Sequence, residues 1–302
     1  MADLRGFETG QRRSAFRSAC DICGGDGSPW LETRGRRLVR CRRCGFTWVP
    51  EGLLFTRRDL SIYEDDELDL FAQDRDYYRD PGALDAARDK VEWVARFVAP
   101  GGRLLDAGAN VGTFVSQAKE RWDAIGLDPS AAAVEWGRAH LGAPLVVGSI
   151  LDEVPPYVER FDAVTLFDVI EHLDDPAAAL RQCRRYLVPG GRLFITTPDI
   201  GSPLARLLGR GWYYLDLDQH ISMFSTATLT TLLRRHGFQV MARRTLGRRY
   251  QFSYIERRLE NLSHQSVILR GAHALALPLR LAPDRHVSIN LGDVVGLVAV
   301  AN

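Results

Sequence analysis

The sequence predicts an α/β protein with a Rossmann-like sheet, preceded by a small N-terminal metal-binding module. Three observations lead to this prediction. Short apolar segments alternate with helical segments between residues 103 and 198, which is typical of parallel strands covered by helices on both faces. A glycine-rich turn, LLDAGANVGTF, joins the first of these strands to the first helix. Two Cys-x-x-Cys pairs lie 17 residues apart near the N-terminus.

The expected elements follow one another in a regular order. Apolar residues at three- and four-residue spacing predict a helix from Ala83 to Val98, which ends at a Pro-Gly-Gly turn. Apolar runs then predict strands, and amphipathic runs predict helices. The predicted strands are 103–108, 124–128, 144–149, 161–169 and 191–198, and the predicted helices are 111–121, 130–140 and 176–187.

The C-terminal third is less regular. Residues 199–225 have no clear period, and a helix (226–236) and a strand (238–245) follow them. We expect an amphipathic helical insertion over 247–285 and a final apolar strand at 293–302. The chain then divides into a flexible N-terminus (1–15), a zinc-ribbon module (16–60) and one large α/β domain (61–302).

Composition and charge exclude several classes of protein. The chain has 302 residues, of which 46% are hydrophobic and 25% charged, as in ordinary globular proteins. Its net charge of +1 argues against a general polyanion binder, so any basic patch has to be local. The N-terminal segment lacks the apolar run of a secretion signal, and no stretch of apolar residues is long enough to span a membrane. We therefore expect a cytoplasmic protein.

Four of the five cysteines predict a metal site. Cys20, Cys23, Cys41 and Cys44 have the spacing of a zinc ribbon, and four thiolates close a tetrahedral Zn²⁺ site without an open position. Such a site is structural, because it stabilises a module that is too small to build a core of its own. Cys183 lies in a helical segment and is expected to be buried without binding metal.

The glycine-rich turn predicts a nucleotide-type site at the end of the first strand. Gly108 and Gly112 allow a ligand to approach the backbone, but Asn110 replaces the middle glycine of a dinucleotide loop. Asp106, two residues before the first glycine, would repel a pyrophosphate and attract an ammonium or sulfonium group. S-adenosylmethionine carries both of these cations and no phosphate. Asp128 ends the second strand, where an acid accepts hydrogen bonds from ribose hydroxyls.

Several segments together resemble one family. LLDAGANVGTF, AIGLDPS, FDAVTLFDVIEHLDDP, YLVPGGRLFITTPD and DQHISMFSTATLTTLLRRHGF are similar to class I S-adenosylmethionine-dependent methyltransferases. The most similar branch is bacterial, methylates sugars and other small metabolites, and includes members with an N-terminal four-cysteine zinc module. The resemblance covers residues 83–246 and extends through the cysteine module to about residue 16. It implies a seven-stranded, mostly parallel sheet whose last strand is antiparallel.

The resemblance also implies which residues bind the cofactor. They are Asp106, Gly108, Asn110 and Gly112 at the methionine and ribose end, Asp128 at the ribose, Ser149 and Ile150 at the adenine, and Phe167 and Asp168 at the methionine moiety. Asn110 departs from the family's usual second glycine and should tighten the loop without excluding the cofactor. Tyr77 and Tyr78 resemble upstream aromatic residues that close over the cofactor in relatives; the alternative is that they pack between the two domains.

Two histidines are candidates for the acceptor side. Methyl transfer to a hydroxyl or a carbon acid needs donor and acceptor aligned at about 3 Å and a proton removed, and histidine is the usual base near neutral pH. His172 follows the fourth strand, and His220 lies in the segment 199–225, which covers the acceptor in relatives. We rank His220 above His172 as catalytic base, with Tyr213 or Tyr214 as helpers. The alternative role for each histidine is to hold its loop.

The expected acceptor is a small molecule, a nucleotide-linked or glycan sugar or a secondary metabolite. The first alternative is RNA, because arginines crowd the segment between the cysteine pairs. These are Arg34, Arg36, Arg37, Arg40, Arg42 and Arg43. Residues 1–60 contain 12 basic and 7 acidic residues, however, and a zinc–thiolate centre adds about two negative charges. Few aromatic residues interleave with the arginines, so we rank an anionic sugar or lipid phosphate above RNA.

Two further alternatives differ in class. An NAD-dependent oxidoreductase is disfavoured by Asp106, and a non-catalytic scaffold is disfavoured by the intact Asp106, Gly108 and Asp128. Residues 255–281 are amphipathic and predict either contact with a membrane surface or, as we prefer, packing over the cleft or against another copy. The sequence leaves the acceptor atom open between O, N and C.

Overall fold

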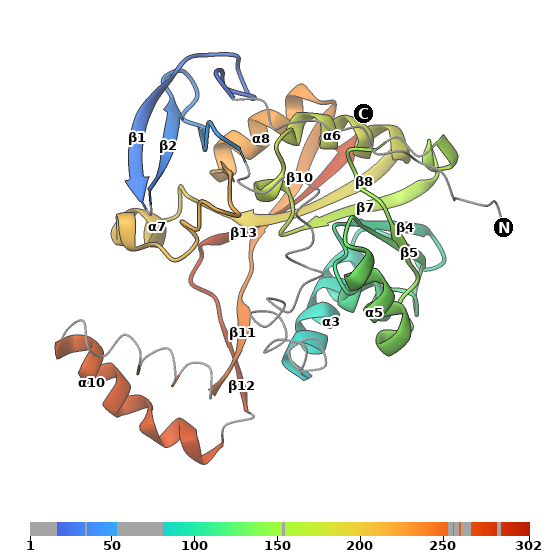
Figure 1. The fold of residues 1–302 in the computed structure, drawn as a ribbon. Helices are drawn as coiled ribbons and strands as arrows, with labels where there is room; N and C mark the ends of the chain where they lie inside the picture. Colours follow the sequence, from blue (N-terminus) through green and yellow to red (C-terminus); the bar gives the residue numbers. More distant parts are fainter. Residues whose placement is uncertain are drawn as a thin grey trace.

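The computed structural model describes residues 17–33, 35–52, 81–152, 155–252, 256, 260, 267–282 and 285–302. The expected flexible N-terminus (1–15), Arg34, Tyr77, Tyr78 and most of the insertion before residue 267 lie outside these residues. A seven-stranded sheet forms the centre of the described part (Figure 1).

The order of the strands matches the predicted fold. From one edge to the other, the sheet runs β10, β13, β8, β7, β4, β5 and β6. Its neighbouring strands are parallel except at β13, which is antiparallel to β8 and to β10, so the predicted antiparallel last strand is confirmed. The bounds are β4 Arg103–Ala107, β5 Asp123–Asp128, β6 Leu145–Val147, β7 Phe161–Phe167, β8 Leu187–Pro198, β10 Phe238–Thr245 and β13 Val294–Ala301.

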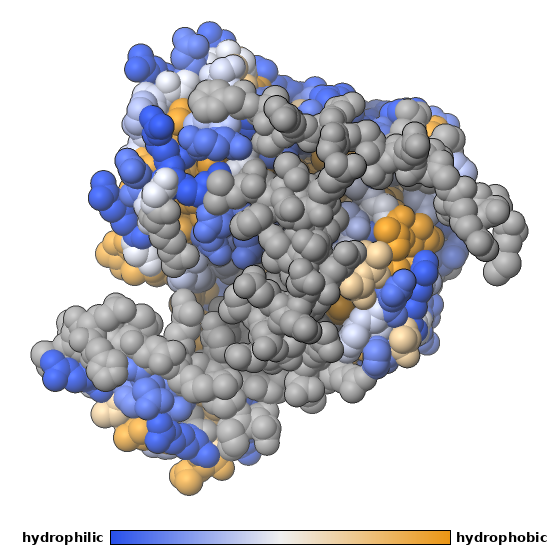
Figure 2. All heavy atoms as spheres, viewed as in Figure 1, coloured by the Kyte–Doolittle hydropathy of each residue, from blue (hydrophilic) through white to orange (hydrophobic). Residues whose placement is uncertain are grey.

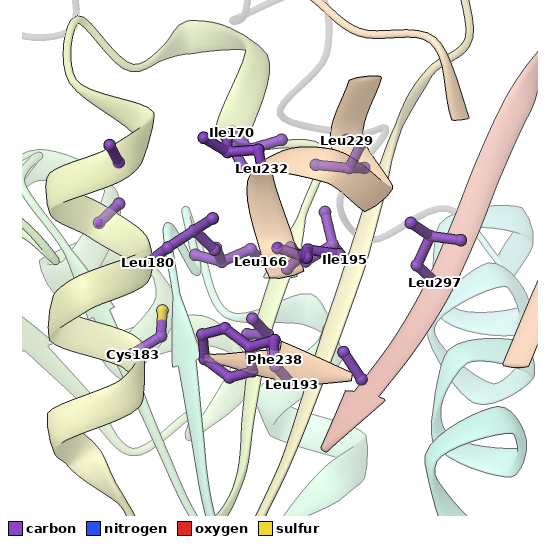
Figure 3. Packing of buried hydrophobic residues seen from close by; sticks show 14 of the residues in the cluster. Leu166, Ile170, Leu180, Cys183, Leu193, Ile195, Leu229, Leu232, Phe238 and Leu297 are labelled. Carbon is purple, nitrogen blue, oxygen red and sulfur yellow. The ribbon is translucent and has the colours of Figure 1, made fainter. Parts of the chain in front are cut away.

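Helices cover both faces of this sheet (Figure 1). Leu104 and Phe194 pack with the helices of one face, while the next residue in each strand, Leu105 and Ile195, packs with those of the other. Figure 3 shows Ile195 among Leu180, Leu232 and other residues of the second of these clusters. The helices of the first face are α3 (Pro81–Ala95), α4 (Thr113–Ala118) and α5 (Ala131–Leu141), and those of the second are α6 (Pro176–Tyr186) and α8 (Thr226–Arg235). Cys183 of α6 is fully buried in the second cluster, as predicted.

The helices begin at residues that cap them. The side chains of Ser130, Asp175 and Ser225 each accept a hydrogen bond from the backbone N–H three residues further on. These caps orient α5, α6 and α8 directly after the loops at the carboxyl edge of the sheet. Strand β8 begins four residues before the predicted start, because Leu187 already pairs with Phe161 before a bulge in the strand.

The cysteine module forms a second sheet that includes a strand of the large domain. Strands β1 (Gly27–Thr33), β2 (Arg36–Cys41) and β3 (Thr47–Trp48) are antiparallel, and β9 (Ser222–Met223) pairs with β3. Strand β9 belongs to the segment 199–225, which we call the lid segment. Its other elements are α7 (Pro203–Leu208) and the 3₁₀ turn η5 (Gly209–Gly211). The lid segment is therefore hydrogen-bonded to the cysteine module, an arrangement that the sequence did not indicate.

The insertion over 247–285 is helical only in part. It begins with β11 (Arg248–Gln251), which pairs with β12 (His286–Ile289), and α10 (Val267–Ala276) lies between these strands in sequence. Residues 248–251 depart from the helical prediction because β11 and β12 satisfy each other's backbone groups, whereas the described residues 252, 256, 260 and 267–281 are helical. The hairpin projects from the sheet and carries α10 (Figure 1), and hydrophobic surface is visible on this part (Figure 2). Among the described residues, no helix combines the length and hydropathy that crossing a membrane requires.

Candidate functional site

The loop between β4 and α4 needs residues that accept a left-handed backbone. Gly108, Asn110 and Gly112 have φ angles of 79°, 50° and 75°. A Cβ atom on Gly108 would lie 2.4 Å from Val169, and one on Gly112 would lie 2.8 Å from a side-chain atom of Leu145, so neither position has room for a side chain. At Asn110 there is room, and asparagine tolerates this conformation. The departure from the glycine pattern is therefore compatible with the loop.

Two buried carboxylates flank this loop. Asp106 is 4% exposed, and Thr165 donates a hydrogen bond of 2.5 Å to it. Burial raises the pKa of Asp106 to about 6. Asp128 accepts hydrogen bonds from the backbone N–H groups of Asn110 (2.7 Å) and Ser130 (2.9 Å). Asp128 thus holds the loop in shape, and both acids lie where a cationic or hydroxyl-bearing ligand would find negative charge.

The next strand contributes a smaller set of polar groups. Ser149 and Ile150 follow β6 and are buried, as is Asp128 at the end of β5, the strand that pairs with β6. The Ser149 N–H donates to the carboxylate of Asp152 at 3.1 Å, and the Ser149 hydroxyl accepts from the Leu151 N–H at 3.2 Å. Asp152 was not among the predicted site residues. Its spacing of three residues from Ser149 is common in turns, so nothing in the sequence singled it out.

At the end of β7, an unexpected lysine meets the predicted site. Phe167 packs edge-on against Phe114, with ring centroids 5.0 Å apart. The ammonium of Lys90, from α3, lies 4.8 Å from the Phe167 centroid and 3.4 Å from the Asp168 carboxylate. Asp168 has a φ of 59°, and its backbone N–H donates to the Thr196 hydroxyl at 3.0 Å. Lys90 is one of two lysines in the chain, which was the signal that could have singled it out.

The structure brings the two predicted histidines together. The 3₁₀ turn η4 (Ile170–His172) follows β7, and the Ile221 N–H of the lid segment donates to the backbone oxygen of Glu171 at 3.0 Å. This bond places His220 beside His172, with ring centroids 4.8 Å apart. Burial lowers the pKa of both histidines, so both rings are neutral at pH 7.

A buried glutamate completes this group, and the sequence-based prediction missed it. Glu171 is 2% exposed, and one of its carboxylate oxygens lies within 4.8 Å of a ring nitrogen of His172 and one of His220. Burial raises its pKa to about 7, with a further contribution from the negative charge of Asp168. The only signal in the sequence was its position next to His172. We call Glu171, His172 and His220 the Glu-His-His cluster.

The two predicted tyrosine helpers have different positions. Tyr214 is buried, and its ring centroid lies 6.1 Å from that of His220. The Tyr213 hydroxyl donates to the carboxylate of Asp293, which also accepts a hydrogen bond of 3.1 Å from the Trp212 indole. Tyr213 thus anchors the lid segment at the start of β13, and Tyr214 is the tyrosine that contacts the histidine pair.

The four cysteines of the N-terminal module converge. One Sγ distance is 3.5 Å, between Cys20 and Cys44, and another is 3.3 Å, between Cys23 and Cys41; all four Sγ atoms lie within 4.8 Å of one another. Tetrahedral Zn²⁺ with Zn–S bonds of about 2.3 Å separates its sulfurs by roughly 3.8 Å. The four thiols therefore fit such an ion. Burial raises the pKa of Cys20 and Cys44, whereas backbone N–H groups oppose the effect of burial at Cys41 and lower its pKa to about 6, so the thiolate is favoured at Cys41.

Two buried arginines join the cysteine module to the lid segment. Arg36 is 7% exposed and donates to the backbone oxygens of Leu217 (2.8 Å) and Gly52, while Arg17 donates to the Ser222 hydroxyl at 3.0 Å. The interpretation of Arg36 as one of a set of anion-binding arginines is therefore wrong, because its donors are used inside the protein. Arg37, Arg40, Arg42 and Arg43 are exposed.

Comparisons with known proteins agree with this geometry. The sequence model of a methyltransferase domain family matches residues 82–243, more than half of the chain. The chain belongs to this methyltransferase family. A ubiquinone biosynthesis O-methyltransferase from Xanthomonas axonopodis pv. citri is 30% identical over 211 residues, which cover 61% of this chain and 85% of that protein. The protein with the same name from Xanthomonas campestris pv. campestris (strain B100) is 33% identical over 180 residues, covering 51% and 74%.

Solved structures share the fold. The 1,6-didemethyltoxoflavin-N1-methyltransferase of Burkholderia thailandensis, solved with 1,6-didemethyltoxoflavin and S-adenosylhomocysteine, has a TM-score of 0.52 at 15% identity and covers 91% of this chain and 99% of its own. A methyltransferase from Archaeoglobus fulgidus also has a TM-score of 0.52, at 16% identity, and covers 76% and 99%. The chain is therefore an S-adenosylmethionine-dependent methyltransferase, and this removes the NAD-dependent oxidoreductase as an alternative.

Proposed function

We propose that this methyltransferase transfers the methyl group of S-adenosylmethionine to a hydroxyl of a sugar or a secondary metabolite. The observation that carries the proposal is the position of the Glu-His-His cluster. Glu171 and His172 lie four and five residues beyond Phe167 at the end of β7, and His220 of the lid segment lies beside them. It supplies neutral histidines beside a buried acid, a chemistry suited to hydroxyl acceptors. The relatives named O-methyltransferases support an oxygen acceptor.

The cofactor roles follow from the carboxylates around the glycine loop. We propose that Asp106 and Asp168 face the cationic methionine end and that Asp128 accepts from the ribose, with Ser149 and Ile150 beside the adenine. Asp106 is buried and close to the loop that has no room for side chains at Gly108. Lys90 competes for Asp168, so the amino group of the cofactor has to share that carboxylate with the lysine.

We further propose that Cys20, Cys23, Cys41 and Cys44 bind a structural Zn²⁺. The fit of the four thiols to a tetrahedron supports it, and four protein ligands leave no position for a substrate. The ion would hold the turn before β1 to the turn after β2 and so fix the module to which strand β9 of the lid segment is hydrogen-bonded. Zinc then serves the acceptor side without taking part in methyl transfer.

The cluster can act on an acceptor hydroxyl in two ways. An Nε2 atom of His220 or His172 can take the proton directly, or both Nε2 atoms can hold a cation that lowers the pKa of the hydroxyl. In either case S–CH₃ cleavage and O–CH₃ formation are concerted, and the bond electrons leave with the sulfur. Alignment of donor and acceptor supplies most of the rate.

Calorimetric titration with S-adenosylhomocysteine, followed by a screen of acceptors, tests the proposal. We expect binding, and methylation of a nucleotide-linked sugar or a polyhydroxylated metabolite. Absence of S-adenosylhomocysteine binding by the folded protein would contradict the proposed function. RNA remains the alternative acceptor, and it predicts RNA binding that falls steeply with salt and requires the exposed arginines Arg37, Arg40, Arg42 and Arg43.

A further inference from the structure

The Glu-His-His cluster has the ligand set of an open metal site. Glu171 and His172 come from η4, His220 comes from the lid segment, and their ligand atoms lie within 4.8 Å of one another. Two imidazole nitrogens and one carboxylate are a common set for catalytic zinc and for other first-row divalent cations, with positions left for substrate. His172 and His220 are 48 residues apart in the sequence, so the fold itself brings the ligand set together.

The hydrogen bonds of the two rings fix the tautomer that metal binding needs. Nδ1 of His172 lies 3.0 Å from the backbone oxygen of Gln219, and Nδ1 of His220 lies 2.8 Å from that of Tyr214. A carbonyl oxygen can only accept, so each Nδ1 carries the hydrogen and each neutral ring keeps a lone pair on Nε2. Metal-binding histidines show this arrangement, with the other ring N–H bonded to a backbone carbonyl or a carboxylate.

Glu171 is the acidic group of the cluster, and its environment favours a cation. Its side chain is almost fully buried, and within the described part of the chain its Oε2 has no hydrogen-bond partner. A buried carboxylate without such a partner costs free energy unless it is protonated or bound to a cation. Asp168 adds negative charge nearby, which increases the attraction for a positive ion.

The same hydrogen bonds argue against direct proton transfer by a carboxylate–histidine pair. In such a pair, the acid accepts a hydrogen bond from Nδ1–H, orients the ring and stabilises its charged form. Here both Nδ1 atoms are hydrogen-bonded to backbone carbonyl oxygens, so Glu171 accepts from neither of them. The rings are therefore arranged as neutral ligands rather than as an activated base.

We propose that Glu171, His172 and His220 bind one divalent cation of the Zn²⁺ or Mn²⁺ type, which holds two neighbouring oxygens of the acceptor. This inference rests on the proposed function and narrows the acceptor to a vicinal diol or a catechol-like pair of hydroxyls. The cation lowers the pKa of the bound hydroxyl, whose proton passes to solvent. The resulting oxygen attacks the methyl carbon; the O–C bond forms, the S–C bond breaks, and S-adenosylhomocysteine leaves with the electron pair.

Titration of the zinc-loaded protein with Mn²⁺ alone, followed by electron paramagnetic resonance, tests the site. Mn²⁺ prefers oxygen and nitrogen ligands and is not expected to displace zinc from thiolates. We expect one Mn²⁺ per chain and a loss of affinity of about tenfold or more in Glu171→Gln, His172→Ala and His220→Ala. The control His236→Ala changes a half-exposed histidine at the end of α8 and should bind Mn²⁺ like the wild type.

Binding of S-adenosylhomocysteine, measured on the same samples, separates the two proposals and reports on folding. Variants that keep this affinity but lose Mn²⁺ support the metal site. Failure of the wild type to bind Mn²⁺ or Zn²⁺ at a second site, or equal binding by wild type and all three variants, would overturn it. His220→Gln, which keeps the size and a polar end, replaces His220→Ala if the lid segment unfolds. Mn²⁺ binding without S-adenosylhomocysteine binding would remove the proposed function and leave the metal site standing.

Discussion

The two ends proposed to bind the cofactor and the acceptor, called below the cofactor end and the acceptor end, are built in different ways. The cofactor end is formed by Asp106, the glycine loop and Asp128, which lie within 23 consecutive residues, from 106 to 128, and meet through parallel neighbouring strands. The acceptor end joins the cysteine module, the turn after β7 and the lid segment, held together by the β3–β9 pairing and by buried arginines. A local motif makes the first, and long-range contacts make the second.

Because of this difference, we expect substitutions at one end to impair that end without impairing the other. A change in the glycine loop distorts a preorganised backbone without touching the cysteine module. We expect a change in the module to loosen the lid segment, which contributes His220 and Tyr214 to the acceptor end, more than it affects the central sheet. The predictions below test this independence, from the largest expected effect to the smallest.

Gly108→Ala should strongly weaken cofactor binding. The new Cβ would lie 2.4 Å from Val169 in a backbone with positive φ, so the loop has to move. We expect S-adenosylhomocysteine affinity to fall by about 100-fold or more, or ~2.7 kcal/mol, measured by calorimetry. Gly190→Ala is the matched control, since Gly190 has nearly the same φ (76° against 79°) and nothing within 4 Å of the added atom. Equal affinity in both variants would show that the loop does not hold the cofactor.

Removal of the metal from the four cysteines should disable the acceptor end alone. A chelator or Cys41→Ser should melt the module, lower turnover with the acceptor by more than about tenfold, and change S-adenosylhomocysteine affinity less than about threefold. Zinc content, heat-induced unfolding and calorimetry measure these outcomes. Cys183→Ala, a buried thiol of the core, should keep its zinc. A parallel loss of cofactor affinity would contradict the separation of the two ends.

Cofactor binding should weaken in acid. The pKa of Asp106 is raised by burial to about 6, and the ionised form attracts the cationic end of S-adenosylhomocysteine. Affinity should fall about tenfold per pH unit below 6 and stay level above it. For the protein without ligand the sign reverses: a raised carboxyl pKa contributes stability at low pH that is lost as pH rises through about 6. Asp106→Asn should remove both dependences; an unchanged affinity profile would exclude Asp106 from the site.

Arg36→Met should loosen the joint between the module and the lid segment. It removes the hydrogen bonds to Leu217 and Gly52 and leaves their carbonyl oxygens unpaired in a buried region. We expect a loss of about 1–3 kcal/mol in unfolding free energy and a higher KM for the acceptor, with an unchanged KM for the methyl donor. Arg37→Met, one residue away and exposed, is the control. Equal unfolding free energies for the two variants would show that Arg36 does not hold the module to the lid segment.

Asn110→Gly should have the smallest effect. Asn110 already has the left-handed φ of 50°, and its backbone N–H donates to Asp128, which glycine preserves. Glycine adds freedom to the unfolded chain, which costs up to about 1 kcal/mol, and the affinity for S-adenosylhomocysteine should change less than about threefold. Calorimetry and urea unfolding measure the two quantities. A gain in affinity above tenfold would show that asparagine narrows the site.

The positions of the glycine loop and its two flanking acids could be predicted residue by residue, and the contacts of the Glu-His-His cluster only in part. Asp106, Gly108 and Asp128 were placed correctly on their strands and loop, because strand order and turn geometry follow from neighbouring residues. His172 and His220 were singled out, but their contact was not, and Glu171 was overlooked because a buried carboxyl looks like any other acid in a sequence. Lys90 was missed for a similar reason, since only the packing of α3 brings it to Asp168.

By itself, the sequence determined the alternation of strands and helices, the left-handed loop and the two cysteine pairs. Each of these depends on residues close together in the chain, where backbone preferences and thiol spacing act directly. The tertiary structure decided which arginines are buried, that strand β9 joins the cysteine module, and that Glu171, His172 and His220 converge. Such contacts arise from the burial of side chains between segments that are distant in sequence, and which side chains are buried together is decided only in the folded chain.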